Sequence, residues 1–204
     1  MVPKGQTLEE RVPVTARGEA TRRKLLEAAG QEFADKGFHA ASVSSITTRA
    51  GVGQGTFYLY FHSKDEIFAS VVRDNARQLR RRLSRAAAAA ADREQAERLS
   101  LQAFLEFAHA QPGGYRVIQE AQFVDEAVFR ECCEDLARSY ADSLRAAALR
   151  AGADEGDDEV RTWALLGIGH FLALRWCLWQ GRLPEAIAIE QAVRTVSAGS
   201  AVQA

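Results

Sequence analysis

The sequence predicts an all-α protein that is built from two helical domains. Apolar residues make up 47% of the 204 residues, charged residues 26%, and there are only four prolines, a composition that suits packed helices. Apolar side chains recur every three or four residues along most of the chain. Glycine, proline and helix-capping residues interrupt this pattern between the helical stretches. We expect domains at residues 17–64 and 65–204, after a disordered lead-in at 1–16.

The overall charge and the cysteines argue against a strongly basic nucleic-acid-binding protein, a disulfide-linked protein and a zinc protein. The formal net charge is −1, so any binding of nucleic acid must come from a local basic face. The three cysteines, Cys132, Cys133 and Cys177, are odd in number and lack C-x-x-C spacing. We therefore expect no disulfide framework, no metal site, no cofactor and a reducing cytoplasmic location.

No membrane span is expected. The most apolar segment, residues 163–179, is interrupted by His170 and Arg175. It is also shorter than the roughly 20 residues that a spanning helix needs. We interpret it as part of a buried helix.

The first domain shows a series of helix starts and stops. A helical pattern over residues 21–36 meets a stop at Gly37. Ser42 is a good N-cap for a short second helix, and Gly51 ends that helix because glycine tolerates positive φ. A third helix follows at once over residues 54–61. Two short helices joined by such a turn form a helix-turn-helix unit.

The third helix has two different faces. Phe57 and Phe61, four residues apart, are expected to face the core. The other side chains of this helix, which are mostly polar or aromatic, are expected to point towards solvent. They are either ordinary surface residues or part of a binding face. After it, Ser63 and Glu66 form a capping box that starts a long fourth helix. This helix continues into the second domain and is expected to end near the alanine run at residues 86–91.

The second domain is expected to hold five further helices. They are a fifth helix ended by Pro112-Gly113-Gly114, a sixth at 115–122, a seventh capped by Asp125 and ended by Gly152, an eighth at 158–180 and a ninth from Pro184 to Val196. The acidic stretch 153–159 is interpreted as a solvated loop. The eighth helix is apolar on nearly every side, which indicates cover from several sides, including a second copy of the chain.

The string TTRAGVGQGTFYLYFHSKDEIF, from Thr47 to Phe68, resembles the signature of the TetR family of repressors. The resemblance covers roughly the N-terminal third, and the rest agrees only in helix pattern. It implies a homodimer that binds a palindromic double-stranded DNA operator and is released by a small, mainly apolar effector. The alternative is a small-molecule-binding helical protein or an enzyme that uses His170 or His109 as a base, although a lone histidine among apolar residues is more often a hydrogen-bonded core residue.

The resemblance assigns the DNA contacts to the second and third helices and the start of the fourth. The candidates are Ser44, Thr48, Gln54, Gly55, Thr56, Tyr58, Leu59, Tyr60 and Lys64. Gln54 is the base-reading candidate, whereas the hydroxyl groups and Lys64 suit phosphate contacts. Basic residues near the start of the first helix either contact phosphate or are solvated. The arginines of the fourth helix, Arg73, Arg77, Arg80, Arg81, Arg82 and Arg85, are interpreted as a solvated face.

The resemblance also implies that helices four to seven enclose a ligand pocket and that helices eight and nine form the dimer interface. The candidate ligand-binding residues are Phe104, Phe107, Tyr115, Phe123, Phe129, Tyr140, Trp163 and His170. A well-filled aromatic core would explain the same aromatic residues. Tyr140 and His170 are the expected polar anchors, since a buried polar group needs a partner.

Overall fold

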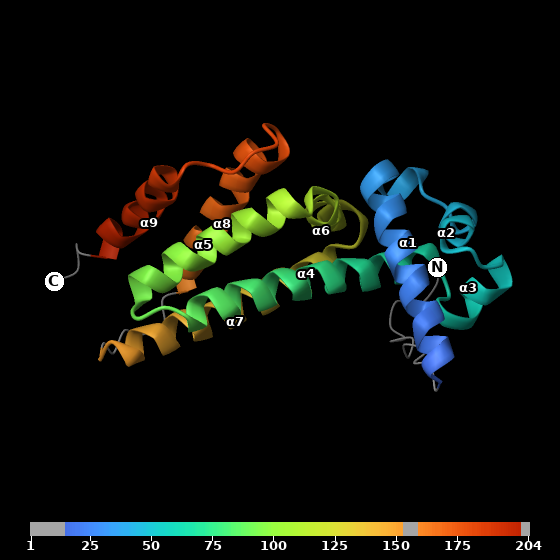
Figure 1. Cartoon of the computed structure of the whole chain (residues 1–204), viewed down its shortest axis with the longest axis horizontal. Coiled ribbons are helices and arrows are strands. Elements are labelled where there is room, and N and C mark those ends of the chain that lie inside the picture. The colour runs from blue at the N-terminus through green and yellow to red at the C-terminus, as the bar shows by residue number, and fades with distance from the viewer. Residues whose placement is uncertain (1–14, 153–158, 201–204) are drawn as a thin grey trace, which may run out of the picture. The chain divides into compact units, whose positions relative to one another are not determined.

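The computed structural model describes residues 15–152 and 159–200, and within these ranges it contains helices and no strand (Figure 1). The all-α prediction is confirmed. The helices are α1 (Ala16–Ala40), α2 (Val43–Ala50), α3 (Gln54–Tyr60), α4 (Lys64–Ala88), α5 (Arg93–Ala110), α6 (Pro112–Val124), α7 (Glu126–Arg150), α8 (Glu159–Leu172), the π-helical segment η1 (Ala173–Leu178) and α9 (Ala186–Ser200).

The chain divides into two compact units, residues 1–71 and 72–204. The division falls between Val71 and Val72, inside the continuous helix α4. The expectation of disorder at 1–16 lies almost wholly outside the described residues, as does the solvated loop expected at 153–159.

The first unit is held together by aromatic side chains from α1, α3 and α4. Phe33 meets Phe68 edge-on with ring centroids 5.1 Å apart, and Phe38 lies 4.9 Å from the same ring. Phe57 and Phe61 are fully buried, as their spacing predicts, with centroids 5.8 Å apart. The rings of Phe33, Phe38 and Phe68 therefore join α1 to α4, and the burial of Phe57 and Phe61 fixes which side of α3 faces the interior of this unit.

Gly37 kinks α1 instead of ending it. Its φ of 76° lies in the left-handed region that glycine alone adopts easily, and one more turn follows to Ala40. The start of α4 matches the predicted cap, because Ser63 Oγ accepts a hydrogen bond from the Glu66 backbone N–H at 3.1 Å. In a standard capping box the Glu66 carboxylate would accept the backbone N–H of the N-cap residue, Ser63. Here it accepts the backbone N–H of His62 instead, one residue earlier.

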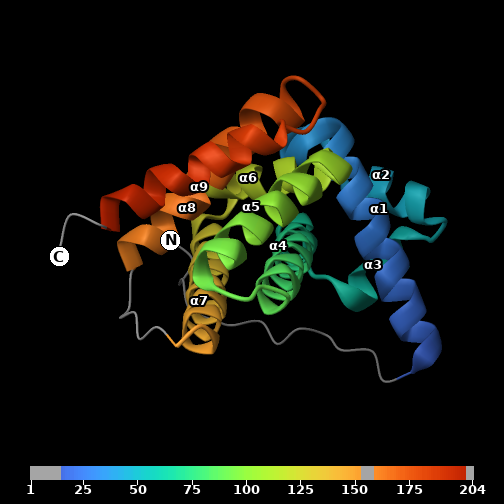
Figure 2. The same cartoon turned by 60° about the vertical axis from the view of Figure 1, so that its left-hand side comes forward.

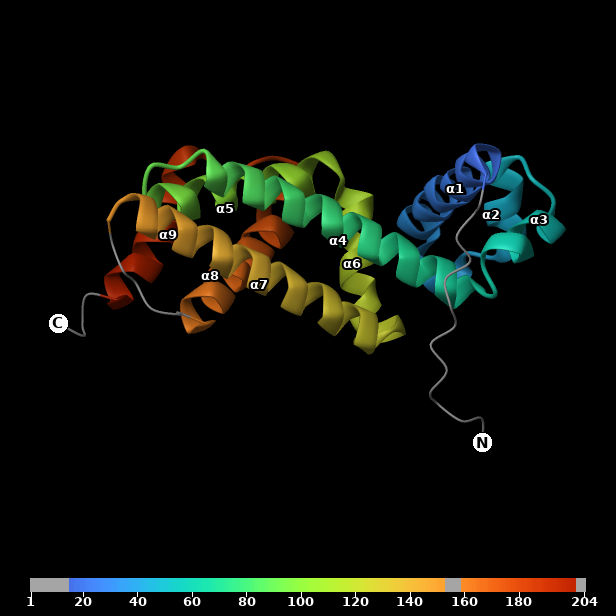
Figure 3. The ribbon, with the colours of Figure 1, turned by 90° about the horizontal axis from the view of Figure 1, so that it is seen from below.

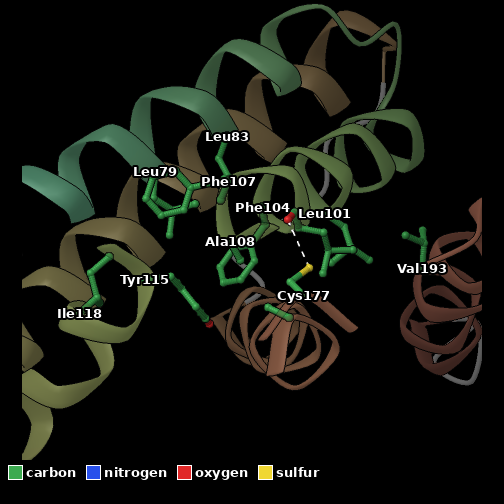
Figure 4. Packing of buried hydrophobic residues seen from close by; sticks show 12 residues of the cluster. Leu79, Leu83, Leu101, Phe104, Phe107, Ala108, Tyr115, Ile118, Cys177 and Val193 are labelled. Carbon is green, nitrogen blue, oxygen red and sulfur yellow. Dashed lines mark hydrogen bonds between the residues drawn. The ribbon is translucent and has the colours of Figure 1, made fainter. Parts of the chain in front are cut away.

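Helix α5 lies at the centre of the second unit. It contacts α6, α7, α8, η1 and α9, and Figure 2 shows α8 and α9 beside it. The main buried cluster joins residues from α4, α5, α6, η1 and α9, and Figure 4 shows them packed around Phe104 and Phe107. This cluster gives these five helical segments a shared apolar interior.

The prediction that Pro112-Gly113-Gly114 ends the fifth helix and precedes the sixth is partly wrong. Helix α5 does end at Ala110, but Pro112 is the first residue of α6. Proline fits there because the first turn of a helix leaves its N–H groups unbonded anyway. A Cβ on Gly114 would lie 2.9 Å from Oδ1 of Asn75, so a larger residue at this position requires the Asn75 side chain to move.

The segment expected to be one helix at 158–180 changes its winding. Helix α8 passes into η1 at Ala173, and the Trp179 N–H bonds the Leu174 carbonyl, five residues back, at 3.0 Å. The Cys177 thiol lies inside the cluster, where it donates to the Leu105 carbonyl at 3.4 Å, drawn as the dashed line in Figure 4. Helix α9 then begins at Ala186, two residues after Pro184, and extends beyond Val196.

Across the described ranges, no helix combines the length and the apolar character that crossing a membrane requires.

Candidate nucleic-acid interface

Helices α2 and α3 form a helix-turn-helix unit whose turn is fixed by backbone hydrogen bonds. Ser42 and Ser45 cap α2 reciprocally, with N–H to Oγ distances of 3.0 and 3.1 Å. Gly51 ends α2 with a φ of 68°. The next residue, Val52, donates its N–H to the Thr47 carbonyl at 3.0 Å. The turn therefore passes directly into α3, which begins at Gln54.

Helix α3 buries one side and exposes the other. Phe57 is fully buried, whereas Tyr58 and Leu59 are 50% and 64% exposed. Gln54 and Gly55 are exposed at the first turn of the helix, and Thr56 and Tyr60 are half-buried. The exposed tyrosine and leucine thus form a small polar and apolar surface on this seven-residue helix, and the buried Phe57 anchors the opposite side of the helix.

Two of the predicted contacts lie on α2. Ser44 and Thr48 are exposed, one turn apart, on the same helix. The Thr48 hydroxyl donates to the Ser44 carbonyl at 2.8 Å. Its oxygen remains an acceptor, so Thr48 must give up this bond before it can donate to a phosphate.

Lys64 is tied to the end of α1. Its ammonium donates to the carbonyls of Phe38 at 2.8 Å and Ala41 at 2.9 Å, and it lies 4.2 Å from the centre of the Phe38 ring. An ammonium has three N–H groups, so one is left for a phosphate. This positioning role of Lys64 was missed, because nothing in the sequence links position 64 to two carbonyls more than 20 residues away.

A network of charges that the sequence did not predict fixes α2 against α1. Glu32 is buried on α1, where its carboxylate accepts from Lys36 Nζ and from Arg49 Nε, each at 2.7 Å. Arg49 on α2 also reaches Asp35 at 2.9 Å. The hydrogen bond from Lys36, the strongest influence, lowers the pKa of Glu32 to about 2. The pair at 32 and 36 has helical spacing, whereas the role of Arg49 depends on the fold.

The predicted ligand-binding residues are not gathered around one site. Phe104, Phe107 and Tyr115 are buried in the main cluster, with Phe129 packed against it. Tyr140 lies in a second cluster with Leu144 and Leu165. The remaining aromatic residues, Phe123 and Trp163, are 84% and 42% exposed.

Phe123 departs from the expected interior position because of its place on α6. Tyr115, Ile118 and Ala121 form the buried side of that helix, and position 123 falls outside it. Trp163 borders an open hollow of about 410 Å³ on the surface between α7 and α8. The aromatic composition alone did not distinguish these faces.

His170 has protein partners in the second unit. Its Nδ1 lies 2.9 Å from the Tyr115 hydroxyl and 3.4 Å from Gln119 Nε2. Burial lowers the pKa of His170 and raises the pKa of Tyr115. A neutral imidazole that accepts from the tyrosine hydroxyl fits these two directions. His109, the other histidine considered as a base, is exposed on α5.

Tyr140 lies near a second buried carboxylate. Glu97 on α5 is fully buried, with Arg93 Nε at 3.1 Å and Arg161 Nε at 2.8 Å from the same carboxylate oxygen. Arg161 Nη2 also donates to the other oxygen at 2.9 Å. Burial, aided by the charge of Glu97, raises the pKa of Tyr140. Its hydroxyl is therefore neutral at physiological pH.

The last helices expose large apolar side chains. Val160 and Phe171 are exposed on α8, Trp179 is exposed directly after η1, and Ile187 is exposed on α9. Exposed apolar side chains in such number often mark a surface that another protein covers.

Residues 25–71 match the sequence model of the bacterial regulatory proteins of the tetR family. This range includes α2, α3 and the first turns of α4. The chain is 34% identical over 121 residues to the HTH-type transcriptional activator FasR of Mycolicibacterium smegmatis, a match that covers 56% of this chain and 55% of that protein. It is 49% identical over 59 residues to the uncharacterized HTH-type transcriptional regulator YdgC of Bacillus subtilis, which covers 29% of this chain and 30% of that one. The chain thus spans about half or less of the length of these curated relatives.

The fold has solved counterparts along most of its length. The fatty acid degradation regulator FadR of Bacillus halodurans superimposes with a TM-score of 0.68 at 19% identity, covering 86% of this chain and 94% of that one. At this identity the likeness concerns the fold, and the residues of the second unit are not carried over from one protein to the other.

Proposed function

We propose that this chain, whose residues 25–71 match the tetR family of bacterial regulatory proteins, is a ligand-responsive repressor of that family in the cytoplasm. In this proposal a homodimer binds a palindromic DNA operator and is released by a small, mainly apolar effector. The observation that carries the proposal is helix α3, which exposes Gln54, Tyr58 and Leu59 while the buried Phe57 anchors it from behind. A helix presented in this way fits the major groove.

The proposed division of labour follows from the chemistry of each side chain. Gln54 reads a base edge, because its amide offers both a donor and an acceptor. Thr56, Tyr58 and Tyr60, with Ser44 and Thr48 on α2, supply hydroxyl groups for phosphate or sugar, while Gly55 and Leu59 lie against the groove. The third N–H of Lys64 completes the phosphate contacts.

The homodimer is proposed to form through α8 and α9. Support comes from the exposed apolar residues Val160, Phe171, Trp179 and Ile187 in this part of the chain. One helix-turn-helix per chain supplies one recognition helix, and a twofold dimer places two of them on the halves of a palindrome.

The effector is proposed to enter the second unit among Phe104, Phe107, Tyr115 and Phe129. These side chains are packed together in the present structure, so an effector must separate them. Helix α4 contributes Leu79 and Leu83 to this cluster and begins at Lys64 in the DNA-binding unit. A ligand that prefers a shifted α4 therefore weakens DNA binding. His170 and Tyr140 would serve as polar anchors only after exchanging their present protein partners for the effector.

Selection of operators from randomised double-stranded DNA tests this function. We expect an inverted repeat whose binding weakens steeply as salt rises, because phosphate contacts dominate the affinity. Gln54→Ala should change the preferred bases within each half-site, and Glu27→Gln, on the exposed side of α1, is the matched control. Enrichment of no sequence, or one consensus shared by wild type and Gln54→Ala, would contradict the assignment of α3.

Activation of transcription is the second candidate, favoured by the 34% identity with a protein named an activator. The two functions differ in what happens at a promoter, since a repressor excludes polymerase whereas an activator recruits it. Transcription in vitro from a promoter that carries the selected operator distinguishes them. If the protein is a repressor, adding it should decrease the amount of transcript. If it is an activator, adding it should increase the amount of transcript.

A further inference from the structure

We propose that the hollow between α4 and α7 is a binding site for a phosphate group, with Arg77 as its central ligand. The hollow has a volume of about 130 Å³ and is lined by Arg73, Arg77 and Arg80 from α4 and by Glu131 and Asp135 from α7. Figure 3 shows α4 and α7 running side by side within the second unit. The site does not depend on the proposed function, because none of its residues lies on the DNA-binding face.

Two of the three arginines are already neutralised. Arg73 binds Glu131 in a two-pronged contact, with Nε and Nη2 within 3.2 Å of the carboxylate oxygens. This contact raises the pKa of Arg73 and lowers that of Glu131. Arg80 reaches Asp135 at 3.3 Å. The two carboxylates of the hollow are thus both engaged by cations.

Arg77 is the cation left over. Among the residues that the structure describes, no carboxylate lies within ion-pair distance of it, and Asp74, one turn earlier, accepts from Gln78 instead. Asp135 is also held from outside the hollow by Arg138 at 3.1 Å. Arg73, Arg80 and Arg81 each lie one turn from Arg77 on α4, and like charges at this spacing destabilise a helix. A bound anion would remove this repulsion.

The remaining walls of the hollow do not repel an anion. Besides the charged residues, the hollow is lined by the apolar side chains of Ala76 and Leu136 and by the thiol of Cys132. Burial raises the pKa of Cys132 to about 11, so its thiol is neutral at physiological pH. The volume accommodates a phosphate group, and the planar guanidinium group matches its oxygens in two-pronged geometry.

Thermal unfolding in the absence of DNA tests the site. We expect inorganic phosphate or glycerol phosphate, titrated against chloride at constant ionic strength, to raise the Tm of the wild type in a saturable manner, by about 3 °C at tenfold excess over Kd. The two titrants distinguish free phosphate from a phosphate group carried by a small molecule. Arg77→Ala should abolish the saturable rise.

Arg81→Ala is the matched control, because Arg81 is an exposed arginine of the same helix outside the hollow. It should keep the full response. Phosphate also stabilises proteins without binding, by exclusion from their surface, and this effect is equal in both variants. An equal response of wild type, Arg77→Ala and Arg81→Ala, or no saturable response to either titrant in the wild type, would overturn the proposal.

Discussion

The two units each bury one carboxylate between two cations, but they do so in different surroundings. In the first unit, Glu32 is held by Lys36 and Arg49, whose side chains are 45% and 34% exposed. In the second unit, Glu97 is held by Arg93 and Arg161, whose side chains are only 9% and 12% exposed. Water can therefore solvate the cations around Glu32 but hardly those around Glu97. The consequences of losing each carboxylate should differ accordingly.

The largest effect is expected in the second unit. Glu97→Gln leaves two arginines buried without their anion, so the free energy of unfolding should fall by about 3–5 kcal/mol. Urea denaturation followed by circular dichroism measures this change. Glu106→Gln, an exposed position of the same helix, is the control and should change little. A loss no larger than that of the control would show that the ion cluster contributes nothing to stability.

A smaller loss of stability is expected for substitution of Glu32, because water can solvate Lys36 and Arg49 when the carboxylate is removed. Glu32→Gln should lower the free energy of unfolding by roughly 2 kcal/mol at neutral pH. The pKa of Glu32 is lowered from 4.5 to about 2 in the folded chain, so its contribution is complete above the ordinary value. It should be lost progressively as the pH falls from about 4.5 towards 2.

Denaturation measured between pH 6 and pH 3, in roughly half-unit steps around the ordinary carboxyl pKa, tests this sign. Wild type and Glu32→Gln should converge in stability as the solution is acidified. Parallel curves for the two proteins would mean that the carboxylate has the same pKa in the folded and the unfolded chain.

The smallest effect concerns Lys64, which binds neutral carbonyls instead of a carboxylate. Lys64→Met keeps the aliphatic stem and removes the ammonium, so unfolding should become easier by about 1 kcal/mol. Because the third N–H is proposed to contact phosphate, the same change should weaken binding to all DNA sequences about equally. Fluorescence anisotropy with specific and unrelated duplexes measures both affinities. A loss confined to one sequence would assign Lys64 to base recognition.

The first unit was more predictable from the sequence than the second, for physical reasons. Ser42, Gly51 and Ser63 act within one turn of their own position, so local spacing indicates the ends of α2 and the start of α4. The contact of Arg49 with Glu32 spans 17 residues and two helices, and only the folded chain brings these groups together. The same limit applies to Lys64.

In the second unit the aromatic residues indicated a core but not which of their faces is covered. Phe104 and Phe123 are both phenylalanines on helices of the bundle, yet one is buried and the other exposed. The difference comes from the rotation of α6, which the apolar pattern of a 13-residue helix fixes poorly. The Glu97 cluster joins α5 to α8 over 64 residues, and local spacing reveals only its pair with Arg93.

The π-helical turn at Ala173–Leu178 couples the length of this stretch to the position of α9. A turn closed by bonds to the fifth residue back holds about one residue more than an α-helical turn. Loss of one residue there would restore ordinary winding, while the surface formed by Val160 and Phe171 upstream would keep its orientation. Everything after the turn would then be displaced along the axis by about 1.5 Å. Because Ala173 and Cys177 belong to the main buried cluster, a change in the length of this stretch would shift α9 and would require that cluster to repack as well.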